Sequence, residues 1–218
     1  MAQSIYFLKK LDEVGTIKAT QKGNLSKNFV IELYHQFFSK ERYARLPNRE
    51  DDLPAITKLR HILDMSGLIK KRSNKFSLTK KGEKIIAGDK TLELFKLLVD
   101  HYFNKWNWGF EDTYPEFRLI QNSAVFNLYL LSKKAQEWIL DKELGEIYLT
   151  AFPALVNEAT DSYFSPEDQI MNSFCIRFLE RGCLPMGLLQ CKEEGKGMER
   201  KTYYKITPFF NQAFKFCL

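Results

Sequence analysis

Four basic side chains fall within six residues of one short segment, and they are the best candidates for a binding function. Residues 67–86 read GLIKKRSNKFSLTKKGEKII and contain seven lysines and arginines against one glutamate. Two short apolar runs flank a polar tip that carries Lys70, Lys71, Arg72 and Lys75. Clustered lysine and arginine side chains neutralise phosphates and release their counterions, so this spacing is typical of a contact with a nucleic-acid backbone.

Catalytic chemistry would need other residues, and the sequence offers no recognisable set of them. It contains no H-E-x-x-H, no G-x-S-x-G and no glycine-rich phosphate loop. The run EGKG at Glu194–Gly197 lacks the flanking strand, the spacing and the Ser or Thr of a phosphate loop. The histidines His35, His61 and His101 lie far apart, and no two cysteines form a C-x-x-C pair, which disfavours a zinc site. We therefore expect a non-enzymatic protein with no catalytic residues, no metal and no cofactor.

Cysteine usage and hydropathy predict the compartment. The cysteines are scattered among apolar neighbours and are predicted to be buried thiols, as in a reducing cytosol: Cys175, Cys183, Cys191 and Cys217. No apolar run reaches 18 residues, and the opening segment MAQSIYFLKKLDEV has too short an apolar core and the wrong flanks for a signal peptide. The sequence predicts a cytoplasmic protein without a membrane partner.

Charge is divided unevenly along the 218 residues. Residues 1–110 carry 21 Lys and Arg against 12 Asp and Glu, a net charge of +9, whereas residues 111–218 carry 12 against 15, a net charge of −3. A basic half predicts an anionic partner, of which nucleic acid is the usual one. Basic residues that only solvate helices would give the same imbalance.

The basic tip is predicted to lie between two helices. LPAITKLRHILDMSG predicts a helix over Leu53–Met65, with Pro54 in its first turn and Gly67 at its end. LIKKR and KFSLT then alternate as two strands around a tight turn at Ser73-Asn74, and Thr79 is the natural N-cap of the next helix. The outer face of the first helix is predicted to expose five polar side chains: Thr57, Lys58, Arg60, His61 and Asp64.

The rest of the chain reads as mainly helical. Apolar residues at helical spacing predict a helix in SKNFVIELYHQFF, one that begins at Ser165, and others over 90–106, 116–132, 133–141 and 143–152. The run WNWGFEDTYPE interrupts this pattern and marks a boundary near residue 110. We expect a mainly α protein with small β-hairpins (α+β), divided into regions 1–110 and 111–218.

The pattern around the basic tip recurs. Gly187-Leu188-Leu189 parallels Gly67-Leu68-Ile69, and Tyr204-Lys205-Ile206-Thr207 parallels Phe76-Ser77-Leu78-Thr79. A fainter third copy over 14–39 places Thr20-x-x-Gly23 where the central copy has Thr79-x-x-Gly82. The irregular period predicts repeats of one supersecondary unit and not a solenoid.

This order of a helix, a Gly-Leu strand, a polar tip, a strand ending in Leu-Thr-x-x-Gly and a helix resembles a winged helix-turn-helix domain of prokaryotic regulators. The resemblance is best over 53–87 and partial over 165–215, and the chain as a whole resembles bacterial proteins with tandem winged-helix-like units joined by helices. In such domains the helix enters the major groove and the wing touches the backbone or minor groove. The resemblance therefore implies duplex DNA as partner of the N-terminal half and a use in transcription regulation, with these DNA-binding residues: Thr57, Lys58, Arg60, His61, Lys70, Lys71, Arg72 and Lys75.

The C-terminal copy departs from the pattern. Phe210 stands where the glycine belongs, and the tip CKEEGKGMERK mixes three glutamates with four basic residues. Such a mixed tip is typical of protein interaction, so a protein partner or a homodimer through the C-terminal half is a further expectation. Two alternatives stay open: a protein-interaction scaffold that binds no DNA, and, for the basic tip, a solvated hairpin edge whose lysines discourage strand pairing between molecules.

Overall fold

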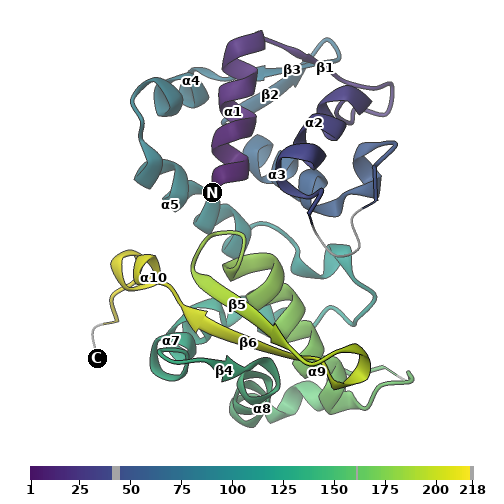
Figure 1. The fold of residues 1–218 in the computed structure, drawn as a ribbon, viewed down its shortest axis with the longest axis vertical. Coiled ribbons are helices and arrows are strands. Elements are labelled where there is room, and N and C mark those ends of the chain that lie inside the picture. The colour runs from purple at the N-terminus through teal and green to yellow at the C-terminus, as the bar shows by residue number, and fades with distance from the viewer. Residues whose placement is uncertain (41–44, 161, 217–218) are drawn as a thin grey trace. The chain divides into compact units, whose positions relative to one another are not determined.

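The computed structural model describes residues 1–40, 45–160 and 162–216, apart from the side chains of Glu111 and Met198 (Figure 1). It is mainly helical with two small antiparallel sheets of three strands each, which confirms the predicted α+β fold class. The chain separates into two compact units, Met1–Lys105 and Trp106–Leu218. The sequence pattern had placed the boundary at residue 110.

The first unit packs helices against a three-stranded sheet. Its elements are α1 (Ala2–Val14), β1 (Ile17–Lys18), α2 (Lys27–Phe37), a 3₁₀ helix (Glu50–Asp52), α3 (Pro54–Met65), β2 (Ile69–Arg72), β3 (Lys75–Leu78), α4 (Lys80–Ala87) and α5 (Thr91–Asn104). The strands lie in the order β1-β3-β2. Apolar side chains of the helices and of one sheet face form the core, among them Phe7, Leu33, Leu63 and Phe76. Burying each such side chain stabilises the fold by roughly 1.5–3 kcal/mol.

The predicted hairpin is present with the predicted register. Ile69 pairs with Leu78 and Arg72 with Lys75. Ser73 and Asn74 have φ of 49° and 54°, as a two-residue turn with both central residues in the left-handed region requires. Along β3, Phe76 and Leu78 are buried and Lys75 is exposed, so successive side chains alternate between the core and the outer face of the sheet.

One polar junction fixes the hairpin between α3 and α4. Gly67 ends α3 with a φ of 70°, as predicted. The Thr79 hydroxyl donates to the Gly67 carbonyl at 2.6 Å and accepts a hydrogen bond from the Gly82 amide at 3.1 Å, so Thr79 caps α4. A Cβ at Gly82 would lie 2.3 Å from the Leu68 carbonyl oxygen. Only glycine therefore allows α4 to approach the sheet this closely.

The second unit has more helical segments. Its elements are a 3₁₀ helix (Trp108–Glu111), α6 (Arg118–Asn122), α7 (Ala124–Lys134), β4 (Ile139–Leu140), α8 (Asp141–Ala151), a 3₁₀ helix (Pro153–Glu158), α9 (Pro166–Phe174), a π-helix (Cys175–Cys183), β5 (Leu189–Glu194), a 3₁₀ turn (Gly197–Glu199), β6 (Lys201–Ile206) and α10 (Pro208–Ala213). The helix predicted over 133–141 is wrong, because α7 ends at Lys134 and the chain then extends into β4, which pairs with β6.

From α7 to α10 the second unit repeats the order of helices and strands found from α1 to α4. Its sheet order, β4-β6-β5, matches β1-β3-β2, and the junction recurs atom for atom. Gly187 has a φ of 77°, and the Thr207 hydroxyl donates to its carbonyl at 2.8 Å and accepts from the Phe210 amide at 3.2 Å. The Leu188 amide donates to the Cys183 carbonyl at 3.0 Å, and in the first unit the Leu68 amide donates to the Leu63 carbonyl at the same distance.

The third copy predicted over 14–39 is wrong. Ile17 and Lys18 pair with Phe76 and Lys75, so they supply the third strand of the first unit. The Gly23 amide donates to the Thr20 carbonyl at 2.9 Å and closes a turn between β1 and α2. Pairing between distant segments, which a local pattern does not reveal, assigns this stretch to the first unit.

A buried ion pair organises the start of the second unit. The Arg177 guanidinium contacts Asp112 twice, through Nε at 2.9 Å and Nη2 at 2.6 Å. It also donates to the carbonyls of Glu116 at 2.8 Å and Pro115 at 2.9 Å. Both charged side chains are nearly inaccessible to solvent. Arg177 therefore ties the π-helix to the irregular segment that precedes α6.

Candidate nucleic-acid interface

The basic tip projects from the outer face of the first sheet. Lys70, Arg72 and Lys75 are exposed, and strand alternation places them on the side opposite the buried Phe76. Lys71 is also exposed but belongs to the other side, where its Nζ occupies the space that a side chain at position 23 would need. The predicted wing cations are thus solvent-accessible, three on one sheet face and one beside the β1–α2 turn.

Strand pairing adds a cation that the sequence pattern missed. Lys18 lies directly opposite Lys75, and Lys75 lies directly opposite Arg72, so three cations form one row across β1, β3 and β2. Like charges directly opposite each other destabilise a pair of strands. Among the residues that the structure describes, no acidic side chain lies within ion-pair distance of Lys18, Arg72 or Lys75. The row therefore presents uncompensated positive charge to the solvent.

The predicted exposure of Lys58 and Arg60 is wrong. Their relative exposures are 9% and 7%. The 3₁₀ helix before α3 supplies the fully buried Glu50, whose Oε1 lies 2.6 Å from Nε of Arg60. The Lys58 ammonium lies 5.7 Å from the centre of the Tyr102 ring on α5. The segment before α3 and the helix α5 therefore cover the face of α3 that helical spacing had marked as outer.

Thr57 and His61 keep partial access to solvent. The Thr57 hydroxyl donates to the Glu50 carbonyl at 3.2 Å. The Arg60 Nη2 lies 3.0 Å from the His61 Nε2, which accepts a hydrogen bond when the imidazole is neutral. Burial, and next the charge of Arg60, lower the pKa of His61 below its ordinary value. Of the four helix residues predicted to read bases, these two half-buried side chains are the ones within reach of a ligand.

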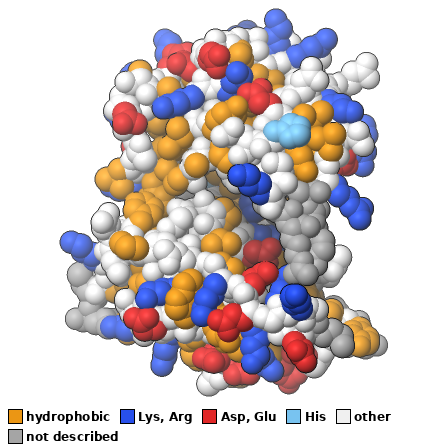
Figure 2. All heavy atoms as spheres, in the orientation of Figure 1, with side chains coloured by type: hydrophobic (Ala, Val, Ile, Leu, Met, Phe, Trp, Pro, Cys, Tyr) orange, Lys and Arg blue, Asp and Glu red, His pale blue; other side chains and the backbone are white. Residues whose placement is uncertain are grey.

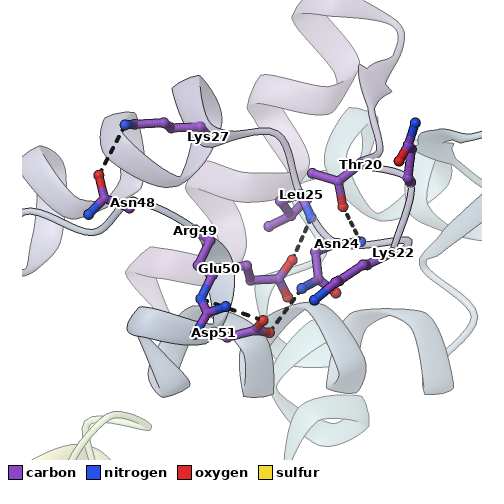
Figure 3. A pocket seen from close by; sticks show the side chains of 10 residues that line it. Thr20, Lys22, Asn24, Leu25, Lys27, Asn48, Arg49, Glu50 and Asp51 are labelled. Atoms are coloured by element: carbon purple, nitrogen blue, oxygen red, sulfur yellow. Dashed lines mark hydrogen bonds and ion pairs between the residues drawn. The ribbon is translucent and has the colours of Figure 1, made fainter.

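A hollow of about 320 Å³ lies beside the start of α2. Figure 3 shows its polar side chains bound to one another: Asn24 to Asp51 and Lys27 to Asn48, while the Leu25 amide donates to Glu50. Arg49 pairs with Asp52 at 3.1 Å. These contacts engage most of the polar lining side chains and hold the segment before α3 against the start of α2, so the hollow is better explained as a structural junction than as a ligand site.

The second hairpin balances its charges. Lys192 pairs with Glu194 at 2.7 Å, Lys205 with Glu137 at 2.8 Å, and Arg200 with Glu193 at 3.5 Å. In Figure 2 the visible face of the second unit shows basic and acidic side chains interspersed. The cationic row of the first sheet has no counterpart here, because Leu140, Tyr203 and Lys192 occupy the matching positions.

The cysteines only partly follow the sequence-based prediction. Cys183 is buried and Cys175 half-buried, and burial raises the pKa of both thiols. Cys191 is exposed on β5, so its predicted burial is wrong, and Cys217 lies outside the described residues. Within those residues no three His, Cys, Asp or Glu side chains gather as metal ligands. No helix in the described part of the chain combines the length and apolar character needed to span a bilayer.

Comparison with models of protein families, with curated proteins and with solved structures found no match for this chain. What the surface can bind is therefore inferred from its own side chains. An exposed row of cations that has no acidic partner among the described residues is suited to a polyanion, and the hairpin that carries it is anchored by the hydrogen bonds of Thr79.

Proposed function

We propose that the chain is a non-enzymatic protein that binds double-stranded DNA and consists of two winged-helix-like units. The proposal rests on the row Lys18, Lys75 and Arg72, which lie side by side on the outer face of the first sheet and have no acidic partner among the described residues. A phosphate backbone would supply the missing negative charge. Transcription regulation is the use that the resemblance implies, and it belongs to the same proposal.

The element order supports the winged-helix assignment. In each unit a hairpin follows the third principal helix, and a short strand from before the second helix completes the sheet. The first hairpin would then act as a wing on phosphates, with Lys70 on the same face as the row and Lys71 on the other side of the sheet, beside the β1–α2 turn. The helix α3 would lie near the DNA, with Thr57 and His61 as the partly accessible side chains among its predicted base contacts.

The inward orientation of Lys58 and Arg60 changes the expected specificity. Arg60 is engaged by Glu50 and cannot contact a guanine edge without breaking a buried ion pair. Binding should therefore depend mainly on backbone phosphates and vary little between duplex sequences. A marked preference for one sequence would require α3 to rearrange.

The test is a titration of fluorescently labelled duplex DNA at a series of salt concentrations. Replacing Lys18, Arg72 and Lys75 with alanine should weaken binding to every duplex alike, and should lower the slope of log affinity against log salt by about three. The matched control replaces Lys196, Lys201 and Lys205 on the second hairpin with alanine, which removes the same charge. That control should keep nearly the wild-type slope.

Two outcomes would contradict the proposal. Equal losses in both triple variants would mean that net charge, and not the first sheet, drives binding. Absence of salt-sensitive binding to any duplex at low ionic strength would favour the second candidate, a scaffold that binds protein alone. The exposed Trp138, which lies just before β4 of the charge-balanced second sheet, is the observation that favours that candidate.

A further inference from the structure

The outer face of the second sheet lacks the cation at two of the three positions of the cationic row and keeps it at the third. Register places Leu140, Tyr203 and Lys192 where the first sheet has Lys18, Lys75 and Arg72. Trp138, just before β4, adds an indole ring that is 38% exposed. One framework therefore carries phosphate-binding chemistry on one copy and aromatic rings on the other.

These rings already hold an ammonium group. The Nζ of Lys192 lies 5.2 Å from the centre of the Trp138 ring and 4.9 Å from the centre of the Tyr203 ring. The same nitrogen lies 2.7 Å from Oε1 of Glu194. Two π faces and a carboxylate around one nitrogen are the groups with which proteins bind alkylammonium ions.

We propose that Trp138, Tyr203 and Glu194 form a binding site for a lysine side chain of a partner protein, and that Lys192 occupies this site in the free protein. The occupant seen in the structure defines the chemistry: a primary ammonium on a flexible alkyl stem. Residues 111–218 carry a net charge of −3, which favours a basic partner at long range, although the hairpin 191–206 itself has five cations against three glutamates.

Lys192 can leave at small cost. Its side chain is 41% exposed, and its ion pair with Glu194 is of the surface kind that contributes little to stability. Departure would expose both rings and free the Glu194 carboxylate together, so a partner lysine would meet all three groups at once. The proposal does not depend on DNA binding by the first unit.

The test uses the full chain and two short peptides, acetyl-Gly-Lys-Gly-amide and the same peptide with norleucine, which lacks the charge. Binding is followed by the upfield NMR shift that ring currents induce in the peptide side chain. Only the lysine peptide should bind. The Lys192→Ala variant should bind it about fivefold more tightly or better, because the internal occupant is gone, and Trp138→Leu should abolish the shift. Lys205→Ala, on the same face but paired with Glu137, should behave as wild type.

Several results would overturn the proposal. Equal binding of both peptides would mean a simple apolar patch. Unchanged affinity in Lys192→Ala would mean that Lys192 does not close the site, and a shift that persists in Trp138→Leu would place binding elsewhere. Quenching of tryptophan fluorescence by oligo(dT) that is lost in Trp138→Leu, with no response to the lysine peptide, would assign the face to single-stranded nucleic acid. Thermal unfolding of each variant shows whether it is folded.

Discussion

The Nε atom of Arg60 lies 2.6 Å from Oε1 of Glu50, and both side chains are buried. The second oxygen of Glu50 accepts a hydrogen bond from the Leu25 amide at the start of α2. One carboxylate therefore joins α2, the segment before α3, and α3 itself. A residue that helical spacing assigns to the DNA-facing surface is instead a structural connection.

Arg60→Met should destabilise the first unit by about 3–5 kcal/mol, because it leaves the Glu50 carboxylate buried without its cation. Adding Glu50→Gln should recover part of that loss, since the amide oxygen can still accept from Leu25 while the buried charge is gone. Urea unfolding of the two single variants and the double variant measures the coupling. An Arg60→Met protein with wild-type stability and weaker DNA binding would show that Arg60 faces the ligand.

Gly82→Ala should destabilise the first unit by about 1–3 kcal/mol, because the new methyl group would meet the Leu68 carbonyl just before β2. An unconstrained helical glycine would respond in the opposite direction, with a gain of about 0.4–1 kcal/mol. The sign of the change in unfolding free energy therefore decides the point. Lys80→Ala, at an exposed position of the same helix, serves as control and should change stability by less than about 0.5 kcal/mol.

Arg177→Lys should destabilise the second unit by about 2–4 kcal/mol although it keeps the charge. Lysine cannot contact Asp112 through two nitrogens and also donate to the Pro115 and Glu116 carbonyls. Thermal unfolding measures the effect. The matched control is Arg118→Lys, whose exposed pair with Glu116 should contribute almost nothing. Similar transitions in the two variants would contradict the structural role of Arg177.

The stability of the first unit should fall as the pH drops from about 7 to about 5, in part through His61. Burial and the Arg60 charge lower the pKa of His61 in the folded state, so the folded protein favours the neutral imidazole. The unfolded chain takes up a proton near its ordinary pKa of 6.5, and the stability present above that pH is lost below it. His61→Gln should flatten this part of the stability curve. Parallel curves for the two proteins would exclude His61 as a contributor.

The hairpin and its junctions could be predicted because their causes are local. Alternation of Phe76 and Leu78 with polar neighbours sets the strand register, and Thr79 and Gly82 act within one helical turn. The matching junction at Gly187 and Thr207 follows from the same short pattern. These features need no knowledge of which distant segments meet.

The cationic row and the burial of Lys58 and Arg60 could not be predicted, because their causes are contacts between segments that lie far apart in the sequence. Lys18 joins the site only because a two-residue strand pairs with β3 across the unit. Helical spacing identifies which residues share a face with Arg60, but not that the segment before α3 folds over that face with Glu50. The polar pattern of a helix with a buried ion pair is the same as that of an exposed helix.

The junctions at Thr79 and Thr207 have a consequence for substitutions on the outer faces of the two sheets. Both anchor a hairpin through backbone carbonyls and amides, and neither draws on a side chain of the outer sheet face. The hairpin fold therefore does not depend on which residues occupy the outer face of its sheet. The first sheet can carry lysine and arginine there and the second tryptophan, tyrosine and glutamate, and substitutions on either outer face need not disturb the fold.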